Sequence, residues 1–304
     1  MTDTLIRECF NEIEEISNAS NHPQLVHASN IIKKSKSEKG ERLKAIENLA
    51  DKYIHYLRAN LHLQGYSREI INQRVELLNQ YYDYYDQPVV SGFDYNKLFT
   101  SQGKLRPTIL EEFMYLLFKD YLADIRNREQ VTDNKLGIGN AKAYTNLFFS
   151  PGSLHDFLGD PSVKINEKNQ DFAIYRTIPI DFCEDEQTHL DAKVPILAVE
   201  VKTYIDKTML EGIIATAEKL KMGNPYSRFI VVSESYQVDR SVDSSYSQID
   251  QIYIIRKCGA MRRMDSRPQI YADVVWRMFE EAKKHIEDTW SDVQTKLERD
   301  GVIY

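Results

Sequence analysis

The sequence predicts a mixed α/β protein in which an all-helical N-terminal region precedes a mixed sheet. Along roughly the first 85 residues, apolar side chains recur at the 3.6-residue spacing of helices. Further along the chain, short segments rich in β-branched and aromatic residues are typical of strands. A helical stretch separates two of these segments, which is the order of a strand, a crossover helix and a parallel strand.

The N-terminal region is expected to contain helices only. The segments with helical spacing run from Leu5 to Ile16, from Leu43 to Leu57 and from near Ser67 to Tyr85. Pro88 and Gly92 then interrupt the pattern. We therefore expect a helical region over residues 1–95 and a second, larger domain over residues 96–304.

The larger domain is expected to carry the sheet. A helix is predicted from Pro107 to about Ile125, followed by a loop at Leu136-Gly-Ile-Gly-Asn. The strand candidates are residues 172–180, 195–201, 228–233 and 251–255. The segment 208–221, between the second and third candidates, has helical periodicity, and a long final helix is expected over residues 269–298.

The composition excludes several classes of protein. The chain has 304 residues, of which 42% are hydrophobic and 28% charged, so it is neither disordered nor fibrous. Its net charge of -7 argues against electrostatic wrapping of nucleic acid and against attachment to an anionic membrane, because both need a cationic surface.

The cysteines and the N-terminus indicate where the protein works. Cys9, Cys183 and Cys258 are widely scattered and lack the spacing of a zinc site. No basic start with an apolar stretch and no apolar run of membrane-spanning length occurs in the sequence. We therefore expect a reducing, cytoplasmic setting and no membrane partner.

The most informative segment is an apolar strand that ends in two charged residues, PILAVEVKT (195–203). Strand alternation puts Glu200 and Lys202 on one face. Burying charge costs free energy unless the charge is paired or binds a metal. Other acid-x-Lys triplets occur in the chain, but only Glu200-Val-Lys202 closes an apolar strand.

Hairpin geometry selects an acidic partner for Glu200. If the strands on either side of the polar loop 181–193 pair antiparallel, the loop centre falls near residue 187 and Asp171 lies beside the Glu200 end. Asp181 and Asp191 would lie at the far end of the same hairpin. Asp171 is therefore the expected partner.

A third carboxylate is expected from the helix that begins near residue 106. Thr108 can cap this helix, and Glu111 three residues later completes a capping box. Glu112 then has no local structural duty, so we prefer it as the metal ligand and keep Glu111 as the alternative. In the competing interpretation, both are first-turn acids favoured by the helix dipole.

These residues suit metal-dependent hydrolysis of phosphodiesters. Asp171, Glu200 and Glu112 are the predicted catalytic metal ligands, because Mg²⁺ prefers oxygen ligands and keeps several waters. Lys202 is predicted to orient the attacking water or to help deprotonate it. The alternative is a purely structural Glu-Lys pair at a strand end.

The chain resembles the BbvCI-type family of type II restriction endonucleases, which have the PD-(D/E)xK nuclease core. The segments that carry the resemblance are RPTILEEFMYLLF (106–118), QDFAIYR (170–176), PILAVEVKTYIDKTMLEG (195–212) and FIVVSE (229–234). The similarity covers about residues 100–257. Gln170 stands where the superfamily name has proline, a loosely kept position.

The resemblance implies a Mg²⁺-dependent endonuclease that cuts double-stranded DNA at a short asymmetric sequence. By motif match, Asp171, Glu200 and Lys202 take the catalytic places. It also implies that Mn²⁺ substitutes, that Ca²⁺ binds without supporting cleavage, and that a companion DNA methyltransferase exists. Known members work as two related but different subunits, each cutting one strand; a homodimer would imply a symmetric target. The N-terminal helices are expected to bind DNA or a second subunit.

Local cations are expected to contact DNA, since affinity depends on local phosphate contacts rather than on whole-chain charge. The candidates are Arg106 and Lys207 near the site and Arg262, Arg263 and Arg267 in the basic run after residue 255. Two other functions remain open: a structure-directed repair or recombination nuclease with the same core, and a non-catalytic DNA-binding module.

Overall fold

A mixed sheet forms the centre of the protein in the computed structural model, which describes residues 3–18, 24–86, 105–132, 135–159, 162–181, 189–239, 246–259, 267–288, 297–298 and 301. Within these residues, five strands follow the order β1-β2-β3-β4-β5. They are β1 (Gly137–Phe149), β2 (Val163–Asp181), β3 (His189–Lys202), β4 (Arg228–Ser235) and β5 (Gln251–Cys258). The first three are antiparallel and the last two run parallel to β3, so the predicted mixed sheet is confirmed.

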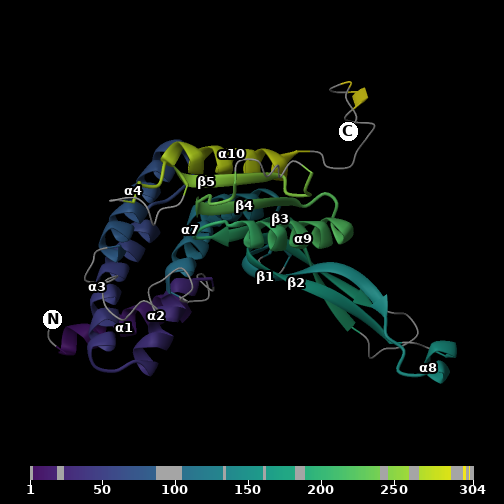
Figure 1. Ribbon diagram of the computed structural model, residues 1–304, viewed down its shortest axis with the longest axis horizontal. Helices are drawn as coiled ribbons and strands as arrows, with labels where there is room; N and C mark the ends of the chain where they lie inside the picture. Colours follow the sequence, from purple (N-terminus) through teal and green to yellow (C-terminus); the bar gives the residue numbers. More distant parts are fainter. Residues whose placement is uncertain are drawn as a thin grey trace.

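Helices cover both faces of this sheet and form the N-terminal region (Figure 1). They are α1 (Asp3–Asn18), α2 (Val26–Ser37), α3 (Glu41–His62), α4 (Arg68–Tyr85), α7 (Leu105–Arg128), α8 (Leu154–Leu158), α9 (Lys207–Gly223) and α10 (Ala272–Glu287). The prediction of a helical N-terminal region is therefore confirmed. The predicted boundary between residues 95 and 96 lies outside the described residues, and the division into two domains stays a prediction.

Strand alternation divides the apolar side chains of the sheet between two cores. Phe172, Val199 and Val232 face the core formed with α7 and α10. Ala198 and Val231 face the smaller core formed with α9. The larger core continues without a break into the N-terminal helices, so burial of apolar surface holds those helices against the sheet.

Helix α9 is the crossover between β3 and β4 that the sequence predicts. The Asp206 side chain accepts a hydrogen bond from the backbone N–H of Met209 and caps the start of the helix. At its other end, Gly223 packs on β1 so closely that a Cβ atom would lie 1.8 Å from the Thr145 carbonyl oxygen. Asn224 Nδ2 also donates to the carbonyl oxygen of Tyr144. These contacts fasten β1 to the body of the protein.

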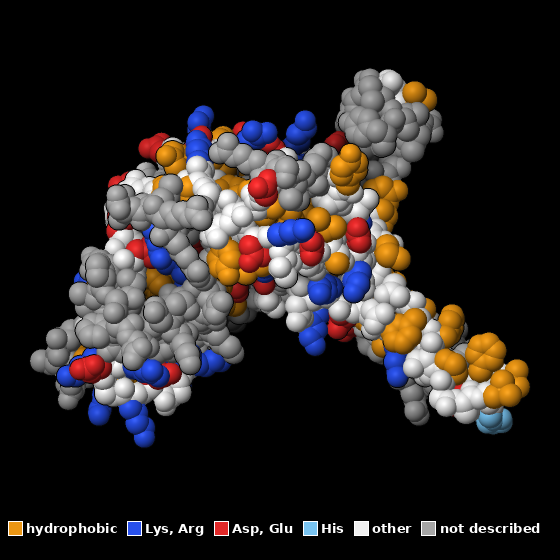
Figure 2. Space-filling model, in the orientation of Figure 1, with side chains coloured by type: hydrophobic (Ala, Val, Ile, Leu, Met, Phe, Trp, Pro, Cys, Tyr) orange, Lys and Arg blue, Asp and Glu red, His pale blue; other side chains and the backbone are white. Residues whose placement is uncertain are grey.

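The strands β1 and β2 extend beyond the other strands as a two-stranded arm with α8 at its tip (Figure 1). In the space-filling view, a concave side lies between this arm and the N-terminal helices (Figure 2). The expected loop at residues 136–140 was wrong, because β1 begins there. The strand predicted from residue 172 also begins earlier, at Val163, because its first half pairs with β1.

Two other expectations need adjustment. The final helix is shorter than predicted, since α10 ends at Glu287. Strands β2 and β3 extend into the predicted loop 181–193, because they continue to pair as far as Asp181 and His189. Along the described parts of the chain, no helix is both long enough and apolar enough to cross a membrane.

Candidate active site

The hairpin of β2 and β3 brings Asp171 beside Glu200 and Lys202, as predicted. Phe172 pairs with Val199 in the antiparallel register, so the residues that flank this pair, Asp171 and Glu200, also adjoin. Asp171 Oδ2 accepts a hydrogen bond of 2.8 Å from the backbone N–H of Val201. The three charged side chains therefore meet where β3 ends.

Lys202 lies between the two carboxylates. Its Nζ atom is 2.6 Å from Glu200 Oε1 and 3.5 Å from Asp171 Oδ2. Burial alone would lower the pKa of Lys202, but the charges of Asp171 and Glu200 outweigh burial and hold it above its ordinary value. Lys202 is therefore a firmly charged ammonium group in this arrangement.

The carboxylates repel one another. The pKa of Glu200 is raised, first by burial and then by the charge of Asp171. The charges of Asp171 and Glu200 also act on Glu111, which lies on α7. Its pKa rises from 4.5 to about 8 through burial, then through Asp171 and Glu200, with Lys202 acting in the opposite direction. Of the two adjacent glutamates on α7, Glu111 is therefore the one whose charge is coupled to Asp171 and Glu200.

The choice of Glu112 as the third carboxylate was wrong. Its side chain is 1% exposed and points to the N-terminal helices. Oε2 accepts hydrogen bonds from the backbone N–H groups of His27 (2.9 Å) and Ala28 (3.1 Å), and Oε1 accepts one of 2.7 Å from the Tyr53 hydroxyl. These N–H groups belong to the first turn of α2, whose N-cap residue offers no side-chain hydrogen bond. Glu112 thus caps α2 from outside the helix.

The helix start explains the error. The capping-box argument needs Thr108 outside the helix, whereas α7 is already helical at Leu105. Thr108 Oγ1 instead donates to the Leu105 carbonyl oxygen and lies 3.0 Å from His27 Nδ1. Glu111 therefore has no capping duty and is available to the site.

A cleft of about 550 Å³ opens at the acidic pair. Asp171 and Glu200 line it, together with Thr216 of α9 and four residues at the base of the arm, Lys142, Glu167, Lys168 and Asn169. The charge of Lys168 lowers the pKa of Glu200, so this lysine lies near the carboxylates. Sequence reasoning missed both lysines, because no strand was expected before residue 172.

The cations predicted to contact DNA lie in different surroundings. Arg106 is 4% exposed and pairs with Asp86 and Glu234 inside the protein, so its assignment as a DNA contact was wrong. The acids that bury it come from distant parts of the chain, which local patterns do not reveal. Arg267 pairs with the same Asp86 but is partly exposed. Lys207 is exposed at the start of α9. Arg262 and Arg263 lie outside the described residues.

The donor atoms suit a hard divalent cation. Asp171 and Glu200 offer oxygens only, and their mutual repulsion would be relieved by a bound cation. Among the described residues, no three His, Cys, Asp or Glu side chains form a ready cluster of metal ligands. Two carboxylates are nevertheless enough for Mg²⁺, which keeps several waters.

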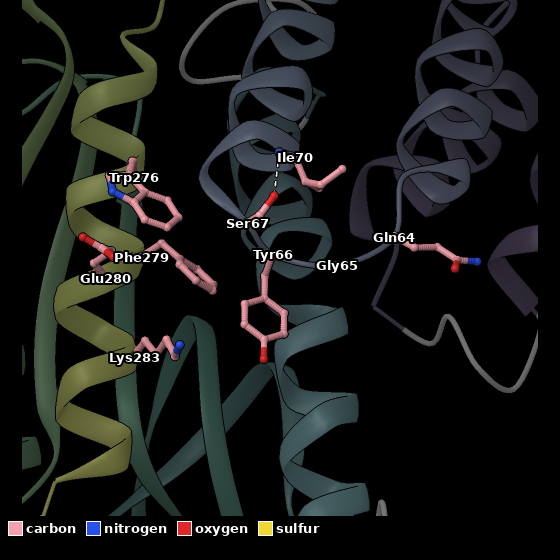
Figure 3. A pocket seen from close by; sticks show the side chains of 9 residues that line it. All are labelled: Gln64, Gly65, Tyr66, Ser67, Ile70, Trp276, Phe279, Glu280 and Lys283. Carbon is pink, nitrogen blue, oxygen red and sulfur yellow. Dashed lines mark hydrogen bonds between the residues drawn. The ribbon is translucent and has the colours of Figure 1, made fainter.

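A second hollow, of about 370 Å³, lies between the α3–α4 connection and α10 (Figure 3). Its wall is mainly aromatic, with Tyr66, Trp276 and Phe279, and Lys283 Nζ lies 5.4 Å from the centre of the Tyr66 ring. Of the described residues that line it, Glu280 alone is acidic. This hollow therefore lacks the carboxylate pair of the cleft beside the arm.

Comparisons with known proteins identify a family for the chain and a similar fold. The family model of the Bpu10I restriction endonuclease matches residues 102–267. The fold is similar to a chain of the native BbvCI A2B2 tetramer, with a TM-score of 0.67 and 19% identity over 87% of this chain and 96% of that chain. No curated protein sequence matches the chain.

Proposed function

Because the chain belongs to the Bpu10I restriction endonuclease family, we propose that it is a subunit of a Mg²⁺-dependent type II enzyme that hydrolyses double-stranded DNA at a short, asymmetric sequence. One observation carries the proposal: Asp171, Glu200 and Lys202 meet beside a cleft at the end of β3. Two acids and a lysine in contact are the groups that metal-assisted phosphodiester hydrolysis needs.

Each residue of the site has an assigned role. Asp171 and Glu200 would hold Mg²⁺, and Glu111 would add a third negative charge near them. When bound, Mg²⁺ polarises the scissile phosphate and lowers the pKa of a coordinated water. The Val201 N–H group fixes the orientation of the Asp171 carboxylate. Lys202 stays protonated because of its raised pKa, so it orients the nucleophile and stabilises developing negative charge.

The base of the arm supplies positive charge to the cleft. Lys142 and Lys168 lie on neighbouring strands and line the cleft beside the carboxylates. We assign them to the DNA phosphates that flank the scissile bond, because lysines bind phosphates as point charges. Lys207 remains a proposed contact on the neighbouring helix α9. The net charge of -7 thus does not describe the cleft itself.

Assembly with other subunits accounts for cutting both strands. A single site of this kind cuts one strand, so a double-strand break needs a second site. The similar fold of BbvCI occurs in an A2B2 tetramer. We propose that this chain likewise works beside a related, different subunit, that more than one copy of each is present, and that a companion DNA methyltransferase protects the host DNA.

Sequencing the ends of cleaved DNA tests the proposed function. The protein is incubated with long duplex DNA and Mg²⁺, alone and with a companion subunit, and the fragment or nick ends are sequenced. The proposal predicts that all ends share one short asymmetric sequence. Ends without a shared sequence would indicate a structure-directed repair or recombination nuclease. Stable DNA binding without any cleavage, with Mg²⁺ or Mn²⁺, would indicate a non-catalytic binding module.

A further inference from the structure

The tip of the β1–β2 arm presents large apolar side chains to solvent. Phe149, Leu154, Phe157 and Leu158 are each 61% to 75% exposed. Every residue of the tip helix α8 is exposed. In Figure 2, hydrophobic side chains gather along the projecting arm, away from the body of the protein. Exposed apolar side chains in such a group mark an interaction surface more often than isolated ones do.

The tip has a defined shape. Ser150 and Ser162 join the two strands where they reach the tip, through a backbone hydrogen bond of 2.7 Å and a side-chain hydrogen bond of 2.8 Å. The Ser153 hydroxyl accepts a hydrogen bond from the Asp156 N–H group and caps α8. A partner would therefore meet a preformed surface and lose less conformational entropy on binding.

The charge distribution along the arm argues for a protein partner at the tip and against DNA. Between Lys142 and Lys164 the sequence contains no Lys or Arg. Binding to DNA phosphates needs cations: Lys142 and Lys168 line the cleft at the base of the arm, whereas Lys164, opposite Phe148, is the one lysine beside the tip. Residues 147–164 include two acids, Asp156 and Asp160, and one base, Lys164, so the net charge of this segment is small and two identical tips can approach without strong repulsion. The chain as a whole, at -7, repels its own copies elsewhere.

The apolar area at the tip matches what a stable pair of proteins needs. Given their exposures, the four side chains offer roughly 500 Å² of apolar surface, from the typical areas of large apolar residues. A standard interface buries about 800 Å² per partner, of which about 60% is apolar. The tip alone therefore offers about the apolar area of one side of such an interface.

We propose that the arm tip is the surface through which two copies of this chain associate, tip against tip. Such a contact is isologous, because the same patch serves both copies about a twofold axis. The functional consequence of this inference rests on the proposed function, because joining two copies would bring two cleavage sites into one assembly. The association itself needs neither DNA nor metal.

Self-association of the purified full-length chain tests the inference. The mass in solution is measured by sedimentation over a range of protein concentrations, with a chelator present and no DNA. The wild type is expected to form dimers. Phe157→Asp places a charge in the contact and should weaken dimerisation about tenfold or more. The matched control is Tyr246→Asp, which changes another highly exposed aromatic residue and should leave dimerisation unchanged.

A second variant tests the same contact in case Phe157→Asp does not fold. Leu154→Ser combined with Leu158→Ser adds no charge, and circular dichroism shows whether each variant is folded. A wild type that stays monomeric, or tip variants that dimerise like the control, would overturn the proposal. Binding of a companion subunit through the tip, without self-association, would overturn the choice of a second copy. A wild-type chain that dimerises but has no nuclease activity with its companion subunit and Mg²⁺ would contradict the proposed function and leave this inference standing.

Discussion

Asp171 Oδ2 and the backbone N–H of Val201 form a hydrogen bond of 2.8 Å across the β2–β3 hairpin. This bond holds the aspartate beside Lys202, which follows Val201 and lies 3.5 Å from the same oxygen. The main chain of β3 thus orients a carboxylate supplied by β2. Geometry of this kind is set when the hairpin forms, before any metal or DNA binds.

Replacing Asp171 by Asn should weaken metal binding while preserving the hairpin. The Asn oxygen can still accept the hydrogen bond from Val201, but the side chain no longer carries a charge. We expect the affinity for Ca²⁺, a cation that should bind without supporting cleavage, to fall about tenfold or more. Titration calorimetry measures this affinity. Glu280→Gln, which removes a carboxylate on α10, is the control and should bind Ca²⁺ as the wild type does.

Glu111 and Glu112 form a natural pair for comparison, because they are adjacent and identical but face different surroundings. Glu111→Gln should reduce cleavage and increase the stability of the metal-free protein, since it removes a carboxylate that is penalised by burial and by repulsion from Asp171 and Glu200. Glu112→Gln should leave the site intact but lower the free energy of unfolding by about 1 to 3 kcal/mol, because it disturbs buried hydrogen bonds. Urea unfolding and a cleavage assay on both variants separate these effects. If Glu112→Gln reduced cleavage and Glu111→Gln only changed the stability, Glu112 would be the metal ligand instead.

The difference between these two glutamates shows where sequence reasoning ends. The register that brings Asp171 to Glu200 follows from strand alternation and the position of the loop, which are local patterns. The partners of Glu112 lie 59, 84 and 85 residues earlier in the chain. No local pattern predicts such contacts, so the choice depended on where α7 begins.

The arm was missed for a similar reason. β1 starts with Gly137 and Gly139, residues that favour turns over strands. Its pairing with the first half of β2 supplies the hydrogen bonds that make both segments strands. The cleft lysines Lys142 and Lys168 belong to these segments. Their positions in the cleft therefore depend on the pairing of β1 with β2, which local sequence patterns do not predict.

His27 should make the protein sensitive to acid. Burial lowers its pKa from 6.5 to about 3, and its ring contacts Thr108, Tyr53 and Tyr81. The unfolded chain therefore takes up a proton below pH 6.5 that the folded chain excludes, and this contribution to stability is lost as the pH falls from 6.5 toward 3. His27→Gln should remove this contribution from the profile of unfolding free energy against pH, whereas the exposed control His55→Gln should not remove it.

Glu112, beside His27, has the opposite effect on stability. Burial raises its pKa from 4.5 to about 7, against the three hydrogen bonds that it accepts. The folded chain thus holds a proton that the unfolded chain releases, and the associated stability is lost as the pH rises from 4.5 to 7. The two contributions oppose each other between about pH 4.5 and 6.5. In the His27→Gln variant, the loss due to Glu112 should appear alone over that interval; an unchanged profile would contradict this view of the buried network.

The cleft lysines should contribute to the salt dependence of DNA binding. Removing one lysine that binds a phosphate should reduce the slope of log affinity against log salt by about 0.9. We expect this change for Lys142→Gln and for Lys168→Gln, and no change for Lys283→Gln on α10, on the far face of the sheet. Fluorescence anisotropy at several salt concentrations measures the slopes. Equal slopes in all the variants would place the DNA elsewhere on the surface.

Cleavage of duplex DNA by wild type, Glu200→Ala and Lys202→Ala, each with its companion subunit and Mg²⁺, tests the central claim most directly. The wild type should cut the strand assigned to this chain. Either variant should cleave that strand more slowly by a factor on the order of 10² to 10³, with DNA binding retained. Cleavage at the wild-type rate by either variant would contradict the assignment of the active site to Asp171, Glu200 and Lys202.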